Sequence, residues 1–289
     1  MSKSFTQKRI EIHLILAEGG FSGGQNVKVI NGLGCDVEIT KPGLPAKNSC
    51  KVTIWGMPRA DMEALTMLAF EPLKVNKNKI AVYAGDDAGL SLAFSGDITT
   101  AWPDFNPAPD VAFQIEALTG YVASVTPRVP YTAKGSVAID AVMRQLAGEM
   151  GLAYVNNGVS GSLPDPALSG GLFEQAHSVA RMANFELIVD DESMVIQPFD
   201  FVRDPEASPP VWRDTTGVKG YPTFTKTGIS VTGLYAPALV QGGLLRVESV
   251  VPKASGSWKI ISLKHKLQAY YTGATAWHTS VEGAYRAGK

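Results

Sequence analysis

Residues 51–55, KVTIW, alternate polar and apolar side chains and end directly before Gly56. The run DVEIT at 36–40 alternates in the same way, and so does RIEIHLIL at 9–16. A period of two puts successive side chains on opposite faces, which is typical of a strand with one buried face. Turns rich in glycine and proline separate the three runs. This part of the chain is therefore predicted to form a sheet with one apolar and one polar face.

The period changes after this sheet and then returns. Residues 58–69 are predicted to form a helix, because Pro58 suits a first turn and one apolar stripe follows, made of Met62, Leu65, Leu68 and Ala69. Further strands are predicted at 79–85, 90–98, 111–117 and around 121–125. Short strands at regular spacing favour a small barrel or sandwich. Residues 1–130 are thus predicted to be a first β-barrel domain with one helix at about 58–69.

The middle of the chain, residues 131–200, has a different pattern. A helix is predicted at about 137–150, with Ser136 as its cap and Gly151 at its end. A strand at 152–155, a polar loop at 156–165, a helix at 172–183 and strands at 185–189 and 193–196 follow. The last two strands flank Asp190-Asp191-Glu192, which predicts a hairpin. The order of elements indicates a compact α+β module.

The last part, residues 201–289, is predicted to be a linker and a second β-barrel domain. The stretch 198–210 (PFDFVRDPEASPP) is typical of a linker, and strands are predicted at 224–235, 244–251, 258–267 and 276–285. The fold class is therefore α+β, mainly β, with two small β-barrel domains and an inserted helix-containing α+β module. No close internal repeat is visible, although low sequence similarity is compatible with one fold for both β segments.

The net charge of −1 hides an uneven distribution. Residues 1–130 carry 12 Lys/Arg against 13 Asp/Glu (−1), residues 131–200 carry 3 against 9 (−6), and residues 201–289 carry 11 against 5 (+6). This contrast indicates modules with different neighbours. The basic residues of the last part stand singly between apolar ones, which favours a solvated strand face over nucleic-acid binding. Charged residues make up only 18%, which fits a surface covered by partners and a modestly charged monomer equally well.

No constellation of catalytic, cofactor-binding or metal-ligating residues emerges from the sequence. His13, His177, His265 and His278 are scattered without a metal motif, and each is expected to be a surface or hydrogen-bonded histidine. Asp86-Asp87, Asp97 and Asp190-Asp191-Glu192 invite a metal or glycosidase interpretation. Paired carboxylates serve catalysis only across a cleft, so we expect solvated turns at the two runs. The chain is predicted not to be an enzyme and to need no cofactor.

Three further features favour plain structural roles. Cys35 and Cys50 lie in strand-like stretches and are expected to be buried reduced thiols. Ser160 lacks the second glycine of a nucleophile elbow, and the glycine-rich stretch 19–24 carries no lysine in the P-loop position, so it is expected to be a loop. The start MSKSFTQKR has no signal-peptide core, and no apolar stretch approaches 18 residues. We expect folding in a cytoplasm-like compartment and no membrane insertion.

Short motifs spread over the chain resemble a known family. DVEIT (36–40) followed by CKVTIWGM (50–57), then AVYAG (81–85) and AFSGDI (93–98), resemble the opening of the central hub proteins of phage baseplates and tail tips, of the P2/Mu type and the T4 type. GLLRVESV (243–250), GSWKI (256–260) and LKHKL (263–267), with Trp277 before the last strand, are similar to their closing barrel. The chain departs from the family pattern at Gly56-Met57-Pro58 and in lacking a tyrosine after Gly85.

The resemblance implies a structural role in a virion tail. Such hubs are expected to be homotrimers whose two related barrels per chain form a pseudo-hexameric ring, a symmetry adaptor. The ring would join a tail tube or distal tail protein to a spike or fibre protein, and DNA would pass through its lumen without specific binding. Assembly would take place in the host cytoplasm. The alternatives are another tail structural protein (a distal tail or tube-adaptor ring, or a part of a contractile injection system), a β-rich cell-wall hydrolase, and a monomeric binding module.

Overall fold

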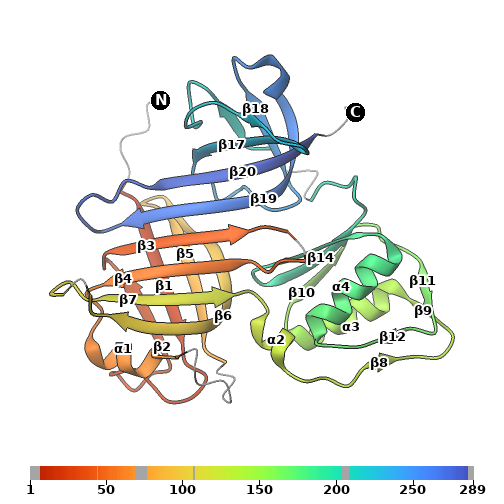
Figure 1. Ribbon diagram of the computed structural model, residues 1–289, viewed down its shortest axis with the longest axis horizontal. Coiled ribbons are helices and arrows are strands. Elements are labelled where there is room, and N and C mark those ends of the chain that lie inside the picture. The colour runs from red at the N-terminus through yellow and green to blue at the C-terminus, as the bar shows by residue number, and fades with distance from the viewer. Residues whose placement is uncertain (1–6, 44, 69–76, 107, 204–207, 286–289) are drawn as a thin grey trace.

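The computed structural model describes residues 7–43, 45–68, 77–106, 108–203 and 208–285. Its main feature is a largely antiparallel sheet of 13 strands that runs through most of the molecule, with a smaller α+β module beside it (Figure 1). The fold is therefore α+β and mainly β, as predicted. Three hydrophobic cores support this arrangement, and the elements around each core are described below as the first β unit, the module and the second β unit.

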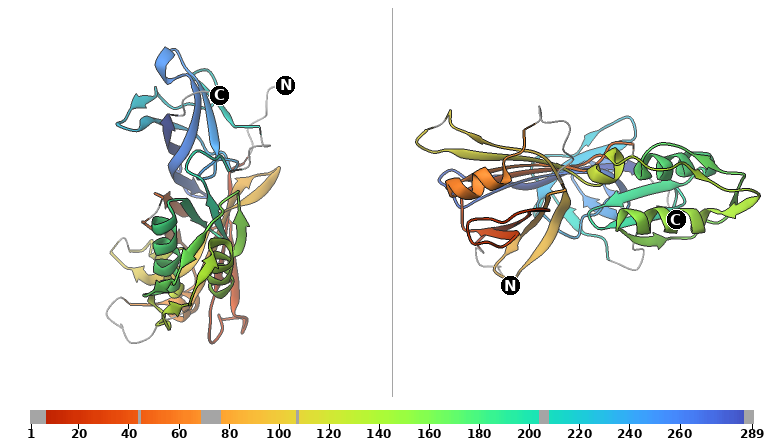
Figure 2. Two further views of the ribbon diagram at one scale, coloured as in Figure 1. Left: turned by 90° about the vertical axis from the view of Figure 1, so that its right-hand side faces the viewer. Right: turned by 90° about the horizontal axis from the view of Figure 1, so that it is seen from below.

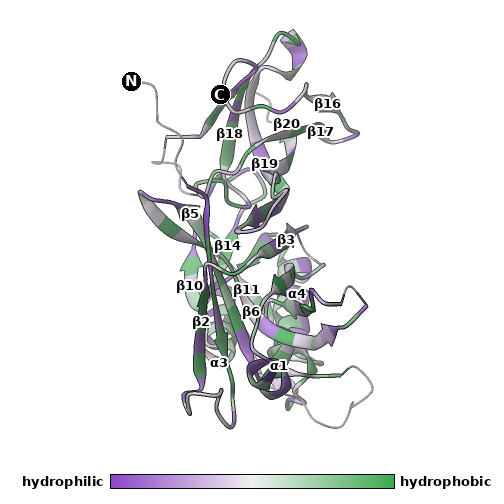
Figure 3. Cartoon of the chain, turned by 90° about the vertical axis from the view of Figure 1, so that its left-hand side faces the viewer, coloured by the Kyte–Doolittle hydropathy of each residue, from purple (hydrophilic) through white to green (hydrophobic). Residues whose placement is uncertain are grey.

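The first β unit holds the largest core. Its elements are β1 (Arg9–Ile15), β2 (Val27–Asn31), β3 (Cys35–Lys41), β4 (Ser49–Trp55), α1 (Arg59–Leu65), β5 (Lys79–Asp86), β6 (Gly89–Asp104) and β7 (Ala112–Leu118). Hydrophilic and hydrophobic residues alternate along its strands (Figure 3), so one face of the sheet is buried. Phe94 and Phe113 are among its largest fully buried side chains.

The helix predicted at 58–69 is shorter in the structure. It ends at Leu65, Thr66 adopts an extended backbone, and Met67 exchanges two backbone hydrogen bonds with Ala101 of β6, at 2.7 and 2.9 Å. Strand pairing therefore takes the chain out of the helix after two turns. Residue 69, part of the predicted apolar stripe, lies outside the described residues.

The module packs two helices on a small sheet. Its elements are α2 (Tyr121–Val125), β8 (Tyr131–Thr132), β9 (Ser136–Ala138), α3 (Ile139–Met150), β10 (Ala153–Asn156), β11 (Ser162–Pro164), β12 (Ala167–Leu168), α4 (Leu172–Ala183), β13 (Glu186–Asp190) and β14 (Ser193–Gln197). The strand order β10-β14-β13 forms the sheet, and α3 and α4 share its core. The predicted helix at 172–183, the hairpin and the left-handed Gly151 that ends α3 are confirmed.

Three predictions for this region are wrong. The stretch 121–125 is helix α2 and not a strand, because Gly120 turns the chain in a left-handed conformation and the Asp97 carboxylate accepts a hydrogen bond from the Val122 N–H at 2.8 Å. Ser136 does not cap α3. It belongs to β9, which pairs with β11, and the helix begins only at Ile139. The predicted loop at 156–165 also contains strand β11, Ser162–Pro164.

The second β unit repeats the strand order of the first. Its elements are β15 (Val211–Arg213), β16 (Thr223–Phe224), β17 (Gly228–Leu234), β18 (Leu244–Glu248), the 3-10 turn η1 (Pro252–Ala254), β19 (Gly256–Ala269) and β20 (Trp277–Tyr285). The order β3-β4-β7-β6-β5-β1 of the first unit recurs as β16-β17-β20-β19-β18-β15. The last pair differs, because β15 runs parallel to β18 whereas β1 is antiparallel to β5.

The long strands β6 and β19 are irregular at matching places. The register shifts between Ile98 and Thr100 in β6 and between Ile260 and Ser262 in β19, where each strand pairs with its hairpin partner. The two units are therefore one fold used twice, although no close repeat is visible in the sequence. The alternation that the two copies share is satisfied by many side chains, so it leaves no close sequence repeat.

The two units are joined edge to edge into one sheet. Residues Leu263–Ala269 of β19 pair with Cys35–Lys41 of β3 in antiparallel register, and the two units stack in Figures 1 and 2 with the module to one side. Among the described residues the strand order is open, from β16 at one end to β2 at the other. Closure of each unit into a small barrel stays a prediction.

Candidate functional site

The sheet face that points away from the cores is polar across both units. On β3, Asp36 and Glu38 alternate with buried valine and isoleucine. Each pairs with a lysine of β19: Lys264 Nζ lies 2.6 Å from Glu38 Oε1, and Lys266 Nζ lies 2.6 Å from Asp36 Oδ1. Lys51 Nζ lies 2.8 Å from a Glu116 oxygen on the next strand pair. Ion pairs therefore span the boundary between the two units on this face.

Hydroxyl and amide groups extend this network. Thr53 donates to Gln114 at 2.7 Å, the Gln268 amide donates to Asp36 at 2.7 Å, and the Thr232 and Ser280 hydroxyls are 2.8 Å apart. We call this surface the polar face; its charged members are Lys51, Lys264, Lys266, Asp36, Glu38, Glu116 and Glu282, three cations against four carboxylates. Each of these three lysines is paired with a carboxylate, which reduces its capacity to neutralise a phosphate.

A second charged cluster is buried at the other side of the sheet. Lys41 Nζ, at the end of β3, lies 2.6 Å from Asp190 Oδ1 and 2.6 Å from Asp191 Oδ2 in the β13–β14 turn. Arg203 Nη1 lies 3.0 Å from the other Asp190 oxygen. We call these four residues the ionic junction. It connects the module to the first β unit and to the segment that leads into the second.

Backbone groups complete the ionic junction. The Ser95 N–H of β6 donates to Asp191 Oδ1 at 2.9 Å, and the Asn48 amide donates to the Val189 carbonyl at 3.1 Å. Buried charges persist when they are both paired and hydrogen-bonded. The ionic junction meets both conditions with groups from β3, β6 and the module, so it fixes the position of the β13–β14 hairpin against the long sheet.

The surroundings shift the pKa values of the two aspartates in opposite directions. Burial raises the pKa of Asp191 to about 6, against the attraction of Lys41 and with repulsion from Asp190. Burial opposes ionisation of Asp190 too, but Lys41 and Arg203 together hold the pKa of Asp190 below its usual range. The pKa of Lys41 is raised, because the two carboxylates outweigh its burial. At neutral pH the ionic junction thus holds two cations and two carboxylates.

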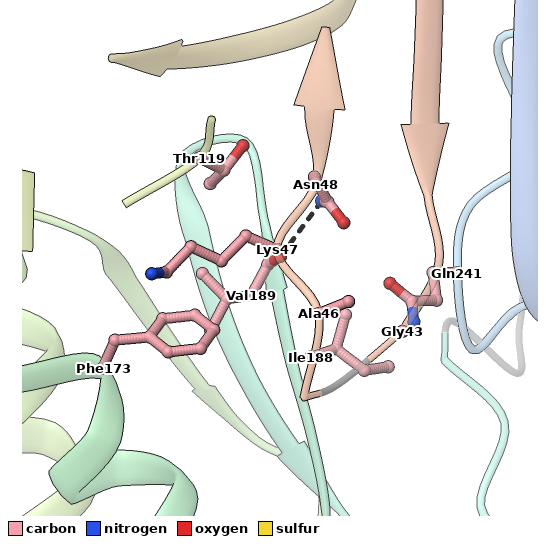
Figure 4. A pocket seen from close by; sticks show the side chains of 9 residues that line it. All are labelled: Gly43, Ala46, Lys47, Asn48, Thr119, Phe173, Ile188, Val189 and Gln241. Carbon is pink, nitrogen blue, oxygen red and sulfur yellow. Dashed lines mark hydrogen bonds between the residues drawn. The ribbon is translucent and has the colours of Figure 1, made fainter. Parts of the chain in front are cut away.

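A second bridge ties the module to the second β unit. Lys259 of β19 donates to Glu186 of β13 at 2.5 Å and to the Phe199 carbonyl at 2.8 Å. Nearby, Gly43, Lys47, Asn48, Phe173, Val189 and Gln241 come together from all three parts (Figure 4). The cavity between them measures about 10 Å³, room for about one water molecule. Acidic residues of the module therefore meet basic residues of its neighbours within the chain.

The turn at Asp190-Asp191-Glu192 is predicted to be solvated, and this prediction is wrong for the two aspartates. The turn exists, since Asp190 pairs with Ser193, but the side chains of Asp190 and Asp191 are only 6% and 13% exposed. Lys41, distant in sequence, covers them. Lys41 itself was missed, although it occupies an inward position after Cys35, Val37 and Ile39, where the alternation calls for an apolar side chain. Asp86-Asp87 does form a turn, and Asp87 lies 3.2 Å from Arg9.

The remaining candidates take structural roles. His265 is buried, its Nδ1 lies 2.8 Å from the Thr279 hydroxyl, and burial lowers its pKa to about 3. His13 lies 2.7 Å from Glu11, and His177 and His278 are on α4 and β20. The prediction of buried thiols at Cys35 and Cys50 is confirmed. Ser160 lies between β10 and β11, and residues 19–24 lie between β1 and β2.

No group of three or more histidine, cysteine, aspartate or glutamate side chains in the described part of the chain could hold a metal ion. No helix among the described residues is long and apolar enough to cross a membrane.

The fold resembles solved phage tail proteins. A tail protein from Neisseria meningitidis MC58 matches with a TM-score of 0.66 at 8% identity, over 96% of each chain. The 43 kDa tail protein of prophage MuSo2 from Shewanella oneidensis matches with a TM-score of 0.63 at 12% identity, again over 96% of each chain. The E. coli c3393 protein, a type VI secretion component similar to T4 gp27 and gp5, matches with a TM-score of 0.56 at 10% identity, over 88% and 74%.

These likenesses define the class: the chain has the fold of phage tail proteins. The sequence model of the baseplate hub gp41 family matches residues 13–273, and the chain belongs to this family. It is therefore a phage tail and baseplate protein, a component of the virion. No curated protein sequence matches the chain. The family resemblance seen in the short sequence motifs is confirmed.

Proposed function

We propose that three copies of this chain form a ring of six β units that joins the tail tube, or a distal tail protein, to the spike or fibre. The observation that carries this proposal is the β19–β3 ladder, which links two units of one strand order within the chain. The equivalent junction between copies would join β16 of one copy to the end of β6 in the next, beyond Ala101, whose backbone groups bond Met67. If it forms, three chains close into a pseudo-hexameric ring. Such heterologous contacts give rings when the rotation closes.

The internal junction fixes which residues would meet between copies. Lys266 of β19 pairs with Glu38 of β3 inside the chain. The first residue after the register shift is Ser262 in β19 and Thr100 in β6. Lys266 lies four positions after Ser262, and Asp104 lies four positions after Thr100, so Asp104 of β6 matches Lys266 of β19.

The partner strand follows from the same comparison. Glu38 pairs with Lys51, which pairs with Glu116. In the second unit, Thr223 of β16 pairs with Ser230, and Ser230 pairs with Glu282. Glu282 lies opposite Ser262, just as Glu116 lies opposite Thr100. Thr223 therefore takes the place of Glu38, and Asp104 of one copy would pair with Thr223 of the next.

Both outer edges expose aromatic side chains that an intersubunit contact would cover. Phe105, directly after β6, is 61% exposed; at the other end Tyr221 is 68% exposed and Phe224 of β16 is 58% exposed. Unpaired strand edges invite pairing with another chain, and aromatic residues are enriched where protein surfaces meet. Ring closure would use both features at once.

The polar face would line the lumen of this ring. With its lysines already paired to carboxylates, it would let DNA pass without specific binding. The role proposed is that of a scaffold and not of an enzyme. Asp190 and Asp191, the closest approach to a carboxylate pair, are held by Lys41 and Arg203 and are not free to act as acid and base across a cleft. Assembly would take place in the host cytoplasm.

Disulfide trapping tests the ring. Asp104→Cys combined with Thr223→Cys should form disulfides between chains under mild oxidation, giving covalent trimers on a denaturing gel and a trimer mass in native mass spectrometry. The matched control, Lys266→Cys with Glu38→Cys, should crosslink within one chain and leave a monomer band. Cys35 and Cys50 are buried, so the unsubstituted chain should not crosslink. A wild-type protein that stays monomeric at high concentration would overturn the proposal.

A further inference from the structure

We infer that the module carries a docking edge for an extended segment of another tail protein, and that this edge is the free side of strand β10. β10 is the end strand in the order β10-β14-β13, and no described strand pairs with its outer side. The proposed ring uses β16 and the end of β6, so it leaves the β10 edge open. The inference adds a separate contact, and it rests on the proposed function only where symmetry excludes a second copy.

The backbone of β10 divides its hydrogen-bonding groups between two sides. The N–H groups of Ala153 and Asn157 both donate toward β14, to carbonyl oxygens at 2.9 Å. The backbone groups of successive strand residues point to opposite sides, so those of Tyr154 and Asn156 point away from β14. Each of these two residues thus presents one N–H and one C=O on the outer side, and such an edge is a template for another strand.

The side chains of the same two residues hold the strand in place. The Tyr154 hydroxyl donates to the Asp140 carboxylate of α3 at 2.9 Å, and the Asn156 amide donates to it at 2.7 Å. Asn156 Oδ1 also accepts the Val159 N–H at 2.8 Å, which fixes the turn after the strand. The edge is therefore ordered before any partner arrives, and an ordered edge loses little conformational entropy when a strand is added.

β10 lacks the usual protection of a strand edge. Its sequence, Ala-Tyr-Val-Asn, holds no lysine, arginine or proline, the residues with which proteins commonly blunt an exposed edge. Val155 is 42% exposed, and Ala153 is exposed on the same face of the strand. A segment paired with β10 would cover both apolar side chains with its own alternate residues, as in other cases of strand addition.

The occupant that fits is a short extended segment of a different protein, with apolar residues at alternate positions and a lysine or arginine among them. Positive charge is expected because residues 131–200 carry 3 Lys/Arg against 9 Asp/Glu, and because the exposed Glu192 lies where β10 begins. Symmetry excludes a second copy. Pairing β10 with β10 uses one surface twice and requires a twofold axis, whereas the proposed ring is built from heterologous contacts.

Hydrogen–deuterium exchange at single amides tests the inference on the purified full-length chain and on tails isolated from the phage. In the purified chain, the amides of Tyr154 and Asn156 should exchange fast, whereas those of Ala153 and Val155 should be protected by β14. In the tails, the amides of Tyr154 and Asn156 should exchange roughly tenfold more slowly or less, because a paired strand supplies the missing acceptors.

A charge at the edge provides the matched variant. Val155→Lys places a cation beside the docking edge, and Val29→Lys makes the same change on β2, the end strand of the long sheet, where Val29 is 44% exposed. Tails that carry Val155→Lys should lose the protection of Tyr154 and Asn156, and tails that carry Val29→Lys should keep it. Both variants should unfold at the wild-type temperature, since both valines are exposed.

The possible failures are distinguishable. Equal exchange of Tyr154 and Asn156 in tails and in the purified chain would overturn the docking edge. Protection of these amides in the purified chain would show that a second copy fills the edge, and it would overturn the proposed occupant. Native mass spectrometry of the same purified chain reports the ring, so a monomer there would overturn the proposed function, while slowed exchange in the tails would still establish the docking edge.

Discussion

The polar face and the ionic junction use the same chemistry, lysine paired with carboxylate, in opposite surroundings. Lys51 and Glu116 on the polar face have side chains 68% and 41% exposed, whereas Lys41 and Asp190 are 7% and 6% exposed. Water screens the exposed pair and leaves it worth about 0–1 kcal/mol. The buried pair cannot lose one member without leaving an unpaired charge in the interior. The polar face therefore sets a surface charge, and the ionic junction fixes a geometry.

This difference accounts for the uneven charge of the sequence. The acidic module uses Glu186, Asp190 and Asp191 to bond three cations: Lys259 of β19, Lys41 of β3 and Arg203 of the segment that follows β14. The contrast between the acidic middle and the basic end is thus partly an internal complementarity. It positions the module against both β units.

The largest effect is expected at Lys41. Replacing Lys41 with methionine removes one of the two cations facing Asp190 and Asp191, and breaking a buried pair costs about 3–5 kcal/mol. We expect a loss of that size in the free energy of unfolding, measured by urea denaturation with tryptophan fluorescence. Adding Asp191→Asn to Lys41→Met should restore part of the loss, since one stranded carboxylate is gone. A loss below about 1 kcal/mol would show that the ionic junction is solvated and does not differ from the polar face.

The next effect is a dependence of stability on pH. The pKa of Asp191 is about 6 in the folded chain, above its ordinary value, so the native state takes up a proton as pH falls through 6 and gains stability. The pKa of His265 is about 3, so the unfolded state takes up its proton first, below about 6.5, and stability is lost. Lys41 and Asp190 lie beside Asp191 and keep their charges over this range, because the pKa of Lys41 is raised and that of Asp190 is lowered. The contributions of Asp191 and His265 therefore oppose each other.

Single substitutions should separate them. From pH 7 to pH 5, Asp191→Asn should lose roughly 1 kcal/mol more unfolding free energy than the wild type, because one pKa unit corresponds to about 1.4 kcal/mol. His265→Gln should lose roughly 2 kcal/mol less than the wild type over the same range. Both slopes come from urea denaturation at a series of pH values, and Thr53→Val on the polar face serves as a control without a titrating group. Parallel slopes in all four proteins would contradict the assignment.

The sequence predicted those parts of the fold that local patterns determine. Alternation located the strands, and the apolar stripe of 172–183 located α4 with its bounds. The side chains of Tyr121–Val125 predict a strand, whereas Gly120 and the distant Asp97 select a helix. Contacts of that kind carry no local signature.

The candidate site was harder to predict for the same reason. Asp190 and Asp191 have the sequence pattern of a solvated turn. Lys41, which binds both carboxylates, lies some 150 positions away in the chain. The β19–β3 ladder consists of backbone hydrogen bonds, and these demand no particular side chains. The signal that the sequence offers is Lys41, a lysine at an inward position of β3. Residue types alone do not separate the ionic junction from the polar face, because both consist of lysines and carboxylates.

The smallest effect is expected on the polar face. Lys51→Ala removes the exposed pair with Glu116, and we expect a change of at most about 0.5–1 kcal/mol in unfolding free energy. The change should shrink as salt rises from 0.05 to 0.5 M, because the Debye length falls well below 10 Å, whereas the cost of Lys41→Met should persist. Urea denaturation of both variants at the two salt concentrations gives the comparison. A salt-independent loss at Lys51 as large as that at Lys41 would remove the distinction between a face that sets charge and a junction that sets geometry.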